Sequence, residues 1–157
     1  MTSDKSFIEV SHAQRTCRFT VAQPFPVPCL GYVIRETPVP WDTRGKNEEE
    51  QAAALERLRK IVLLGDTNNP DEIVPLVNSS PGHVALAVHE ATDCYIPSNV
   101  DPQQKTGKGR STESVHDVSL QRGHSTPHMA GKFANDIGAR RLVLNHIGAR
   151  CVISVPS

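Results

Sequence analysis

Residues 61–66 read "IVLLGD", an apolar run that ends in a glycine and an aspartate. Two similar runs follow, "VALAVHE" (84–90) and "RLVLNH" (141–146). Short continuous apolar runs bounded by polar residues are typical of strands buried on both faces of a sheet. We therefore expect three such strands at 61–65, 84–88 and 141–145.

Helical patterns alternate with these runs. Helices are expected at 47–60, within 69–82 with an end near Val77, and at 126–138. The first has an acidic first turn and a basic last turn, which complement the helix dipole. The last has Thr126 as N-cap, Pro127 at the first helical position and Gly138 as its stop. Helices alternating with apolar strands predict an α/β layered sheet.

The rest of the chain is less strongly patterned. Further short strands are expected at 6–10, 16–22, 29–36 and 151–155. The strand within 23–36 is expected to begin only at Cys29, because the prolines before it would interrupt a central ladder. Residues 97–112 are polar with few apolar side chains, which predicts a mobile loop.

Composition narrows the function classes. The 157 residues correspond to a single domain. With 17 Lys and Arg against 17 Asp and Glu, no net field draws the chain to nucleic acid or to a membrane. The four cysteines form no C-x-x-C pair, and no stretch has the pattern of a signal peptide or a membrane span. We expect an intracellular, cytoplasmic protein with reduced thiols and no membrane partner.

The three apolar runs end in ionisable residues, Asp66, Glu90 and His146, and His124 stands just before the last helix. Sites in α/β folds form at the carboxyl ends of strands, which predicts that these four cluster. Asp66 and His146 offer an oxygen and a nitrogen suited to Zn²⁺ or Mn²⁺. Glu90 and His124 suit a carboxylate that orients a proton-transferring imidazole.

Each of these residues, taken alone, also has a purely structural interpretation. Asp66 opens "GDTNNP", which has turn chemistry. His146 could be a satisfied strand-end histidine, and Glu90 a surface carboxylate. His128, four positions after His124, is interpreted as a surface residue because the helix must turn its apolar stripe inward.

The segments "LLGDT", "VHEAT", "GHSTPHMAGKFA" and "RLVLNHIGAR", in this order, resemble the C-terminal half of tRNase Z. That family comprises zinc-dependent endoribonucleases of the metallo-β-lactamase fold that cleave the 3′ trailer of precursor tRNA, and the resemblance covers roughly residues 25–152. It implies that Asp66 bridges two zinc ions and that His146 is a ligand to one. It also implies that Glu90 orients His124, which protonates the leaving 3′-oxygen.

The sequence departs from the family in its metal ligands. The motif H-x-H-x-D-H is absent, and Phe25 stands where the family has another histidine. The family's H-F-S-x-R-Y becomes "HIGARC", in which Arg150, a phosphate contact by resemblance, is kept. The resemblance thus implies one truncated domain over residues 1–157, an incomplete αββα sandwich made mainly of the C-terminal sheet and its helices.

Three functions stay open at this point. The first is the tRNase Z type of endoribonuclease. The second is a non-catalytic fragment that acts, if at all, through a partner, which would be a second copy in a homodimer or a missing N-terminal half. The third is a metal-dependent hydrolase of a non-RNA substrate.

Overall fold

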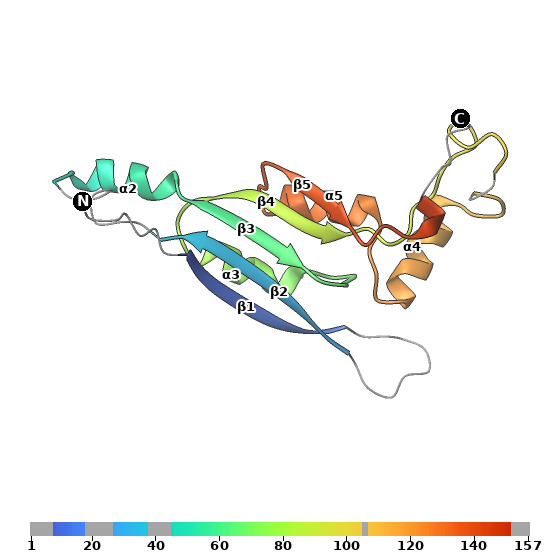
Figure 1. Cartoon of the computed structure of the whole chain (residues 1–157), viewed down its shortest axis with the longest axis horizontal. Helices are drawn as coiled ribbons and strands as arrows, with labels where there is room; N and C mark the ends of the chain where they lie inside the picture. The colour runs from blue at the N-terminus through green and yellow to red at the C-terminus, as the bar shows by residue number, and fades with distance from the viewer. Residues whose placement is uncertain (1–7, 18–26, 38–44, 105–106, 152–157) are drawn as a thin grey trace, which may run out of the picture.

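A computed structural model describes residues 8–17, 27–37, 45–104 and 107–151 (Figure 1). One five-stranded sheet has the order β1-β2-β3-β4-β5. The strands are β1 (Ile8–Cys17), β2 (Val27–Glu36), β3 (Arg59–Leu64), β4 (His83–Glu90) and β5 (Leu142–Asn145). The helical elements are α2 (Glu48–Glu56), η1 (Asp71–Ile73), α3 (Val74–Asn78), α4 (Thr112–Gln121), α5 (Pro127–Asp136) and η2 (Ala149–Cys151). The expected α/β class is confirmed.

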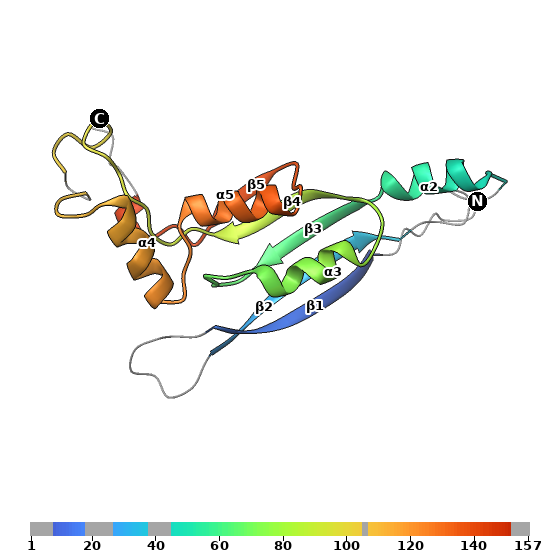
Figure 2. The same cartoon turned by 180° about the vertical axis from the view of Figure 1, so that it is seen from behind.

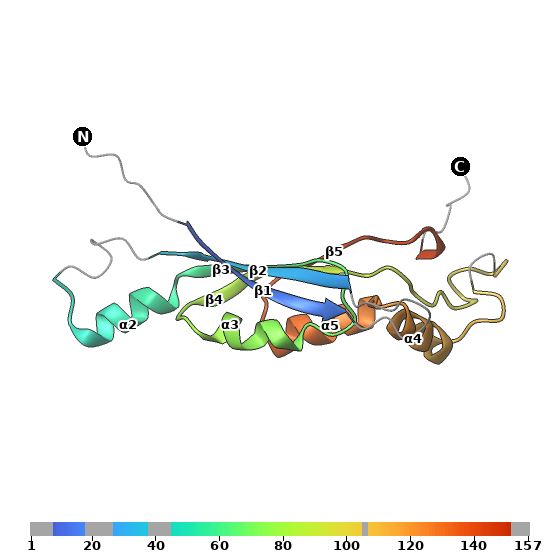
Figure 3. The ribbon, with the colours of Figure 1, turned by 90° about the horizontal axis from the view of Figure 1, so that it is seen from below.

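The sheet is mixed. β1, β2 and β3 pair antiparallel, whereas β3, β4 and β5 pair parallel. The parallel strands are joined through α3 and through α4 and α5. Figures 2 and 3 show α3 and α5 against the same face of the sheet. The carboxyl ends of β3, β4 and β5 therefore lie at one edge.

The core lies between the sheet and these helices. Val33, Val62 and Ala87 are register neighbours on adjacent strands, and all three are buried. Phe133 from α5 and Ile73 from η1 belong to the same apolar cluster. The sheet is thus packed against helices on this face.

The opposite face of the sheet corrects one expectation. In β3 burial alternates, so that Val62 is fully buried and Ile61 only partly. On the same face as Ile61, Tyr32 and Val143 are 36% and 48% exposed. The strands are therefore buried on one face rather than two, because no described element covers the other (Figure 3).

Two strand boundaries also differ from expectation. The segments expected at 6–10 and 16–22 contribute to one strand, β1, and residues 6–7 and 18–22 lie outside the described part. β2 begins at Val27 and includes Pro28. The proline is tolerated because β3 pairs with β2 only from Gly31 onward, so at Pro28 only β1 is a neighbour.

The helix expected at 47–60 is shorter. Asn47 and Glu50 form a capping box, and α2 ends at Glu56. Its last turn contains no basic residue, because Arg59 and Lys60 already belong to β3. The predicted basic last turn is therefore wrong, and pairing in the sheet overrides the local helical pattern.

The C-terminal elements follow a similar pattern. Thr126 caps α5 and Gly138 follows it with a φ of 62°, as predicted. Helix α4 was not expected. It begins at Thr112, the last residue of the segment 97–112 that was expected to be a loop. The mobility of that loop stays a prediction. Of the strand expected at 151–155, Cys151 lies in η2 and the rest is outside the described part.

Among the described residues, no helix combines the length and apolarity needed to span a membrane. The compartment stays a prediction.

Candidate functional site

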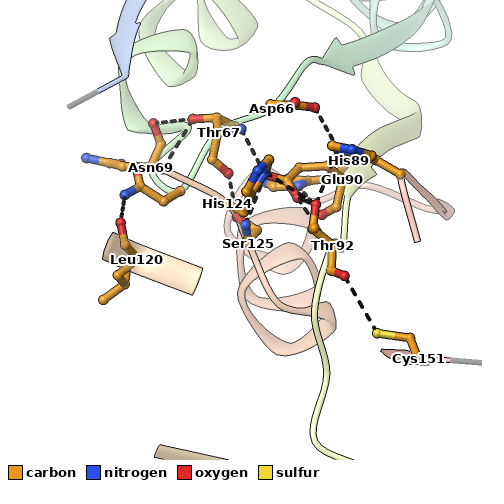
Figure 4. Close-up of polar contacts among 12 residues, drawn as sticks. Asp66, Thr67, Asn69, His89, Glu90, Thr92, Leu120, His124, Ser125 and Cys151 are labelled. Atoms are coloured by element: carbon orange, nitrogen blue, oxygen red, sulfur yellow. Dashed lines mark hydrogen bonds and ion pairs between the residues drawn. The ribbon is translucent and has the colours of Figure 1, made fainter. Parts of the chain in front are cut away.

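The carboxyl ends of the parallel strands carry the predicted residues. Asp66 follows β3, Glu90 ends β4 and His146 follows β5. His124 lies in the connection between α4 and α5. The structure brings all four side chains together at this edge of the sheet. Figure 4 shows Asp66, Glu90 and His124 there.

Glu90 is the centre of the arrangement. Its side chain is 1% exposed, so the surface-carboxylate interpretation is wrong. Oε1 accepts hydrogen bonds from the backbone N–H groups of Thr67 and Ser125, both at 3.0 Å, and lies 3.2 Å from Nδ1 of His124. Oε2 accepts from the N–H and the hydroxyl of Thr92 at 3.1 and 2.5 Å. One buried carboxylate thus joins the segments that follow β3 and β4 to the start of α5.

The same segments are tied to each other. The hydroxyl of Ser125, itself fully buried, donates to the carbonyl of Thr67 at 2.6 Å. The hydroxyl of Thr126 accepts from the N–H of Met129 at 3.3 Å and so begins α5 directly after the site. The helix start and the site are therefore positioned together.

His124 is held with one ring nitrogen inward. Its Nδ1 faces Glu90, and its backbone N–H donates to the carbonyl of Ser119 at 2.9 Å. A protonated Nδ1 that donates to a carboxylate leaves Nε2 as the functional nitrogen. The His124 side chain is 22% exposed, so the ring reaches the surface of the site.

His146 and Asp66 form the outer part of the site. Nδ1 of His146 lies 2.8 Å from Oδ1 of Asp66, and both side chains are about half exposed, at 48% and 55%. His146 has a φ of 51°, in the left-handed region, which residues other than glycine adopt rarely. The Thr92 hydroxyl lies 3.3 Å from Nδ1 of both His124 and His146.

The two imidazoles are neighbours, with ring centroids 5.3 Å apart and planes inclined by 71°. Asp66, His124 and His146 each offer one ligand atom, and these atoms all lie within 4.8 Å of one another. Two nitrogens and a carboxylate oxygen are a donor set that suits Zn²⁺. The residues present fit a metal ion such as zinc, and His124 lies within reach of the same position as Asp66 and His146, the two ligands predicted from the sequence.

Cys151 lies next to the site and contacts Thr92. Its thiol donates to the carbonyl of Thr92 at 3.8 Å. Burial, together with the neighbouring Cys94, raises the pKa of the Cys151 thiol to about 12. Among the described residues, the ligand atoms that converge at this site come from Asp66, His124 and His146, and Cys151 is not one of them.

Sequence reasoning missed the residues that position the site. Thr67, Thr92 and Ser125 each stand one or two positions after Asp66, Glu90 and His124. Their signal was present in the quoted segments "GDT", "HEAT" and "HST". Small hydroxyl residues after a strand end are also ordinary turn chemistry, which hides such a role.

The remaining histidines lie elsewhere. His128 is exposed on α5, as expected, and His89 is buried with its ring edge-on to Phe133. His83 and His116 have their nearest polar partners in Glu56 and Asp117. Phe25 and the side chain of His12 lie outside the described residues.

Comparison with known proteins gives a likeness to a solved structure. No protein-family model matches the chain, and no curated protein does. The chain is similar to the crystal structure of human tRNase Z, short form, with a TM-score of 0.48 and 24% sequence identity. The alignment covers 99% of this chain and 41% of that chain, so this chain spans less than half of that protein's length. A TM-score and a sequence identity this low do not show what activity this chain has.

Proposed function

We propose that the chain provides part of the active site of a zinc-dependent endoribonuclease of the tRNase Z type, which cleaves the 3′ trailer of precursor tRNA. The observation that carries the proposal is the convergence of Asp66 and His146 with the buried Glu90–His124 pair at one sheet edge. The sequence segments that resemble tRNase Z are the same ones that build this edge.

Asp66 and His146 would hold the metal. Their exposed position at the rim leaves room for a substrate group. When bound, zinc supplies an activated water and stabilises charge on the phosphoryl oxygens. Asp66 and His146 would orient that centre, since each is attached to the end of a rigid strand.

His124 would transfer the proton to the leaving 3′-oxygen. The buried Glu90 holds Nδ1, so the ring would be fixed at that nitrogen and Nε2 would be the one to meet the substrate. A carboxylate held by four other hydrogen bonds is a fixed support rather than a mobile group. The same ring is close enough to the rim to be a ligand, and the variants below separate these two roles.

A complete site would need further ligands. Catalytic zinc usually has three protein ligands, and two metals need more than the described residues provide. The uncovered apolar face of the sheet, with Leu30, Tyr32 and Val143 exposed, supports a partner layer that brings them. We propose that a second copy of this chain, or a separate N-terminal half, provides that layer and completes an αββα sandwich.

A cleavage assay tests this proposal. The chain, loaded with zinc, is incubated with a precursor tRNA that carries a 3′ trailer, over a range of protein concentrations. We expect cleavage at the trailer junction that rises more steeply than linearly with concentration if copies associate. His124→Ala should abolish it, whereas His128→Ala, a control on the exposed face of α5, should not. Absence of cleavage at all concentrations would refute an activity of this chain and favour the non-catalytic alternative.

A further inference from the structure

We propose that a pocket next to His124 binds a phosphate group of the polynucleotide that flanks the one being cleaved. The pocket holds about 270 Å³, and its lining includes Ser119, Arg122, His124 and Arg150. This inference rests on the proposed function for its ligand, the nucleic-acid backbone. The charges of the pocket and one buried hydroxyl support it as an anion site.

Two guanidinium groups give the pocket its charge. Arg122 is exposed and forms no ion pair within the described part of the chain. Arg150 lies 3.8 Å from Asp93, whose carboxylate is bound more closely by Arg110 at 2.5 Å. The one acidic residue in the lining is therefore held mainly by Arg110, which leaves Arg122, unpaired within the described residues, and the loosely paired Arg150 to meet an anion. Guanidinium groups bind phosphate oxygens in a bidentate geometry.

Ser119 gives the second, independent indication. Its side chain is 2% exposed, and its hydroxyl has no hydrogen-bond partner among the described residues. A buried hydroxyl without a partner costs free energy, and such groups are uncommon unless a ligand or water completes them. Ser119 lines the pocket, so a rotation of its side chain would present this hydroxyl to a phosphate oxygen.

The end of α4 does not repel an anion here. The last carbonyls of a helix carry partial negative charge, which would oppose phosphate if they were unpaired. The carbonyl of Ser119 accepts from the backbone N–H of His124, and that of Leu120 accepts from the side chain of Asn68 at 2.8 Å. These interactions direct the carbonyls into the fold and leave the arginines and the hydroxyl for the ligand.

The pocket shares His124 with the proposed catalytic site. A phosphate bound by Ser119, Arg122 and Arg150 would therefore lie beside the reacting group rather than at it. We infer that this pocket sets the register of the substrate strand, because one anchored phosphate fixes which neighbouring bond meets His124.

Binding by the zinc-free protein tests the pocket apart from catalysis. Inorganic phosphate and a short RNA oligonucleotide are titrated into the full chain and followed by NMR signals of Ser119, Arg122 and Gly148. We expect saturable shifts, tighter binding of the oligonucleotide than of phosphate, and weakening by about tenfold in Arg122→Gln. Ser119→Ala should weaken binding by about threefold to tenfold without lowering the melting temperature, since it removes an unpaired hydroxyl.

Arg57→Gln is the matched control, because Arg57 is an exposed arginine at the C-cap of α2, as Arg122 is at that of α4. An equal loss of binding in Arg57→Gln, or shifts that do not saturate, would overturn the pocket as a site. Phosphate bound as tightly as the oligonucleotide would overturn its assignment to the backbone. If the pocket binds the oligonucleotide but no precursor tRNA is cleaved, only the proposed function is rejected. If Arg122→Gln cleaves and binds the substrate normally, only the proposed phosphate pocket is rejected.

Discussion

Nδ1 of His124 lies 3.2 Å from Oε1 of Glu90, a carboxylate with 1% of its side chain exposed. The same carboxylate accepts from the backbone at Thr67, Thr92 and Ser125. The orientation of the imidazole is therefore coupled to the positions of three chain segments. Glu90 serves the fold and the proposed chemistry at the same time.

Replacing Glu90 should destabilise the fold. Glu90→Ala leaves three backbone N–H groups without their acceptor, and each costs about 1–3 kcal/mol when it stays buried, so we expect a loss of at least about 3 kcal/mol. Urea unfolding measures the change. Glu49→Ala, on the exposed face of α2, should stay within about 0.5 kcal/mol of the parent. Equal stability of the two variants would contradict the role of Glu90 as a structural centre.

The hydroxyl of Thr92 should matter to metal binding without touching the metal. It donates to Glu90 at 2.5 Å and lies 3.3 Å from both His124 and His146. Thr92→Val keeps the shape and removes these contacts, so zinc affinity should fall about tenfold. Thr92→Ser keeps the hydroxyl and should bind nearly as the parent does. Indistinguishable zinc titrations for the two variants would rule out this support.

Replacing Gly148 should lower the stability of the fold for a steric reason. A Cβ at this position would lie 2.2 Å from the carbonyl of Thr92, which the Gly148 N–H also binds at 3.0 Å. Gly148→Ala must shift the segment after His146, and we expect a loss of about 1–3 kcal/mol. Gly131, within α5, has nothing within 4 Å of such a Cβ, so Gly131→Ala should gain about 0.5–1 kcal/mol. Melting temperatures that move in the same direction would refute this contrast.

Lys60 should give the stability a dependence on alkaline pH. Its ammonium donates to the carbonyls of Val77 and Ser80 at 2.8 and 2.7 Å, and burial lowers its pKa. The unfolded chain then binds more protons between that lowered pKa and the ordinary value of about 10.4, so stability rises with pH in this window. Lys60→Met should lack the rise. Parallel profiles of unfolding free energy against pH would show that burial does not disfavour the charge.

The elements of the parallel half of the sheet could be predicted because their sequence patterns are local. "TPHMAGKFANDIG" carries its own cap and stop at Thr126 and Gly138, and α5 follows them. Helix α4 was missed because its capping box pairs Ser111 with Ser114 instead of with a glutamate, inside a polar segment. The burial of each strand on one face only could not be read from apolar runs, because it depends on where the helices pack.

The site was partly readable for the same reason. Parallel strands align their carboxyl ends, so Asp66, Glu90 and His146 could be expected at one edge. The burial of Glu90 and the 5.3 Å approach of His124 to His146 depend on the connections between the strands. These contacts between distant segments leave no periodic trace in the sequence.

Zinc binding tests the central claim most directly. Calorimetric titration of the metal-free chain should show saturable zinc binding in the parent and loss of that binding in Asp66→Ala and His146→Ala. His124→Ala should have a much smaller effect, because the account assigns His124 to proton transfer. Asp136→Ala, which removes an exposed carboxylate at the end of α5, should bind as the parent does. Zinc bound with equal affinity by the parent and by Asp66→Ala would contradict the account.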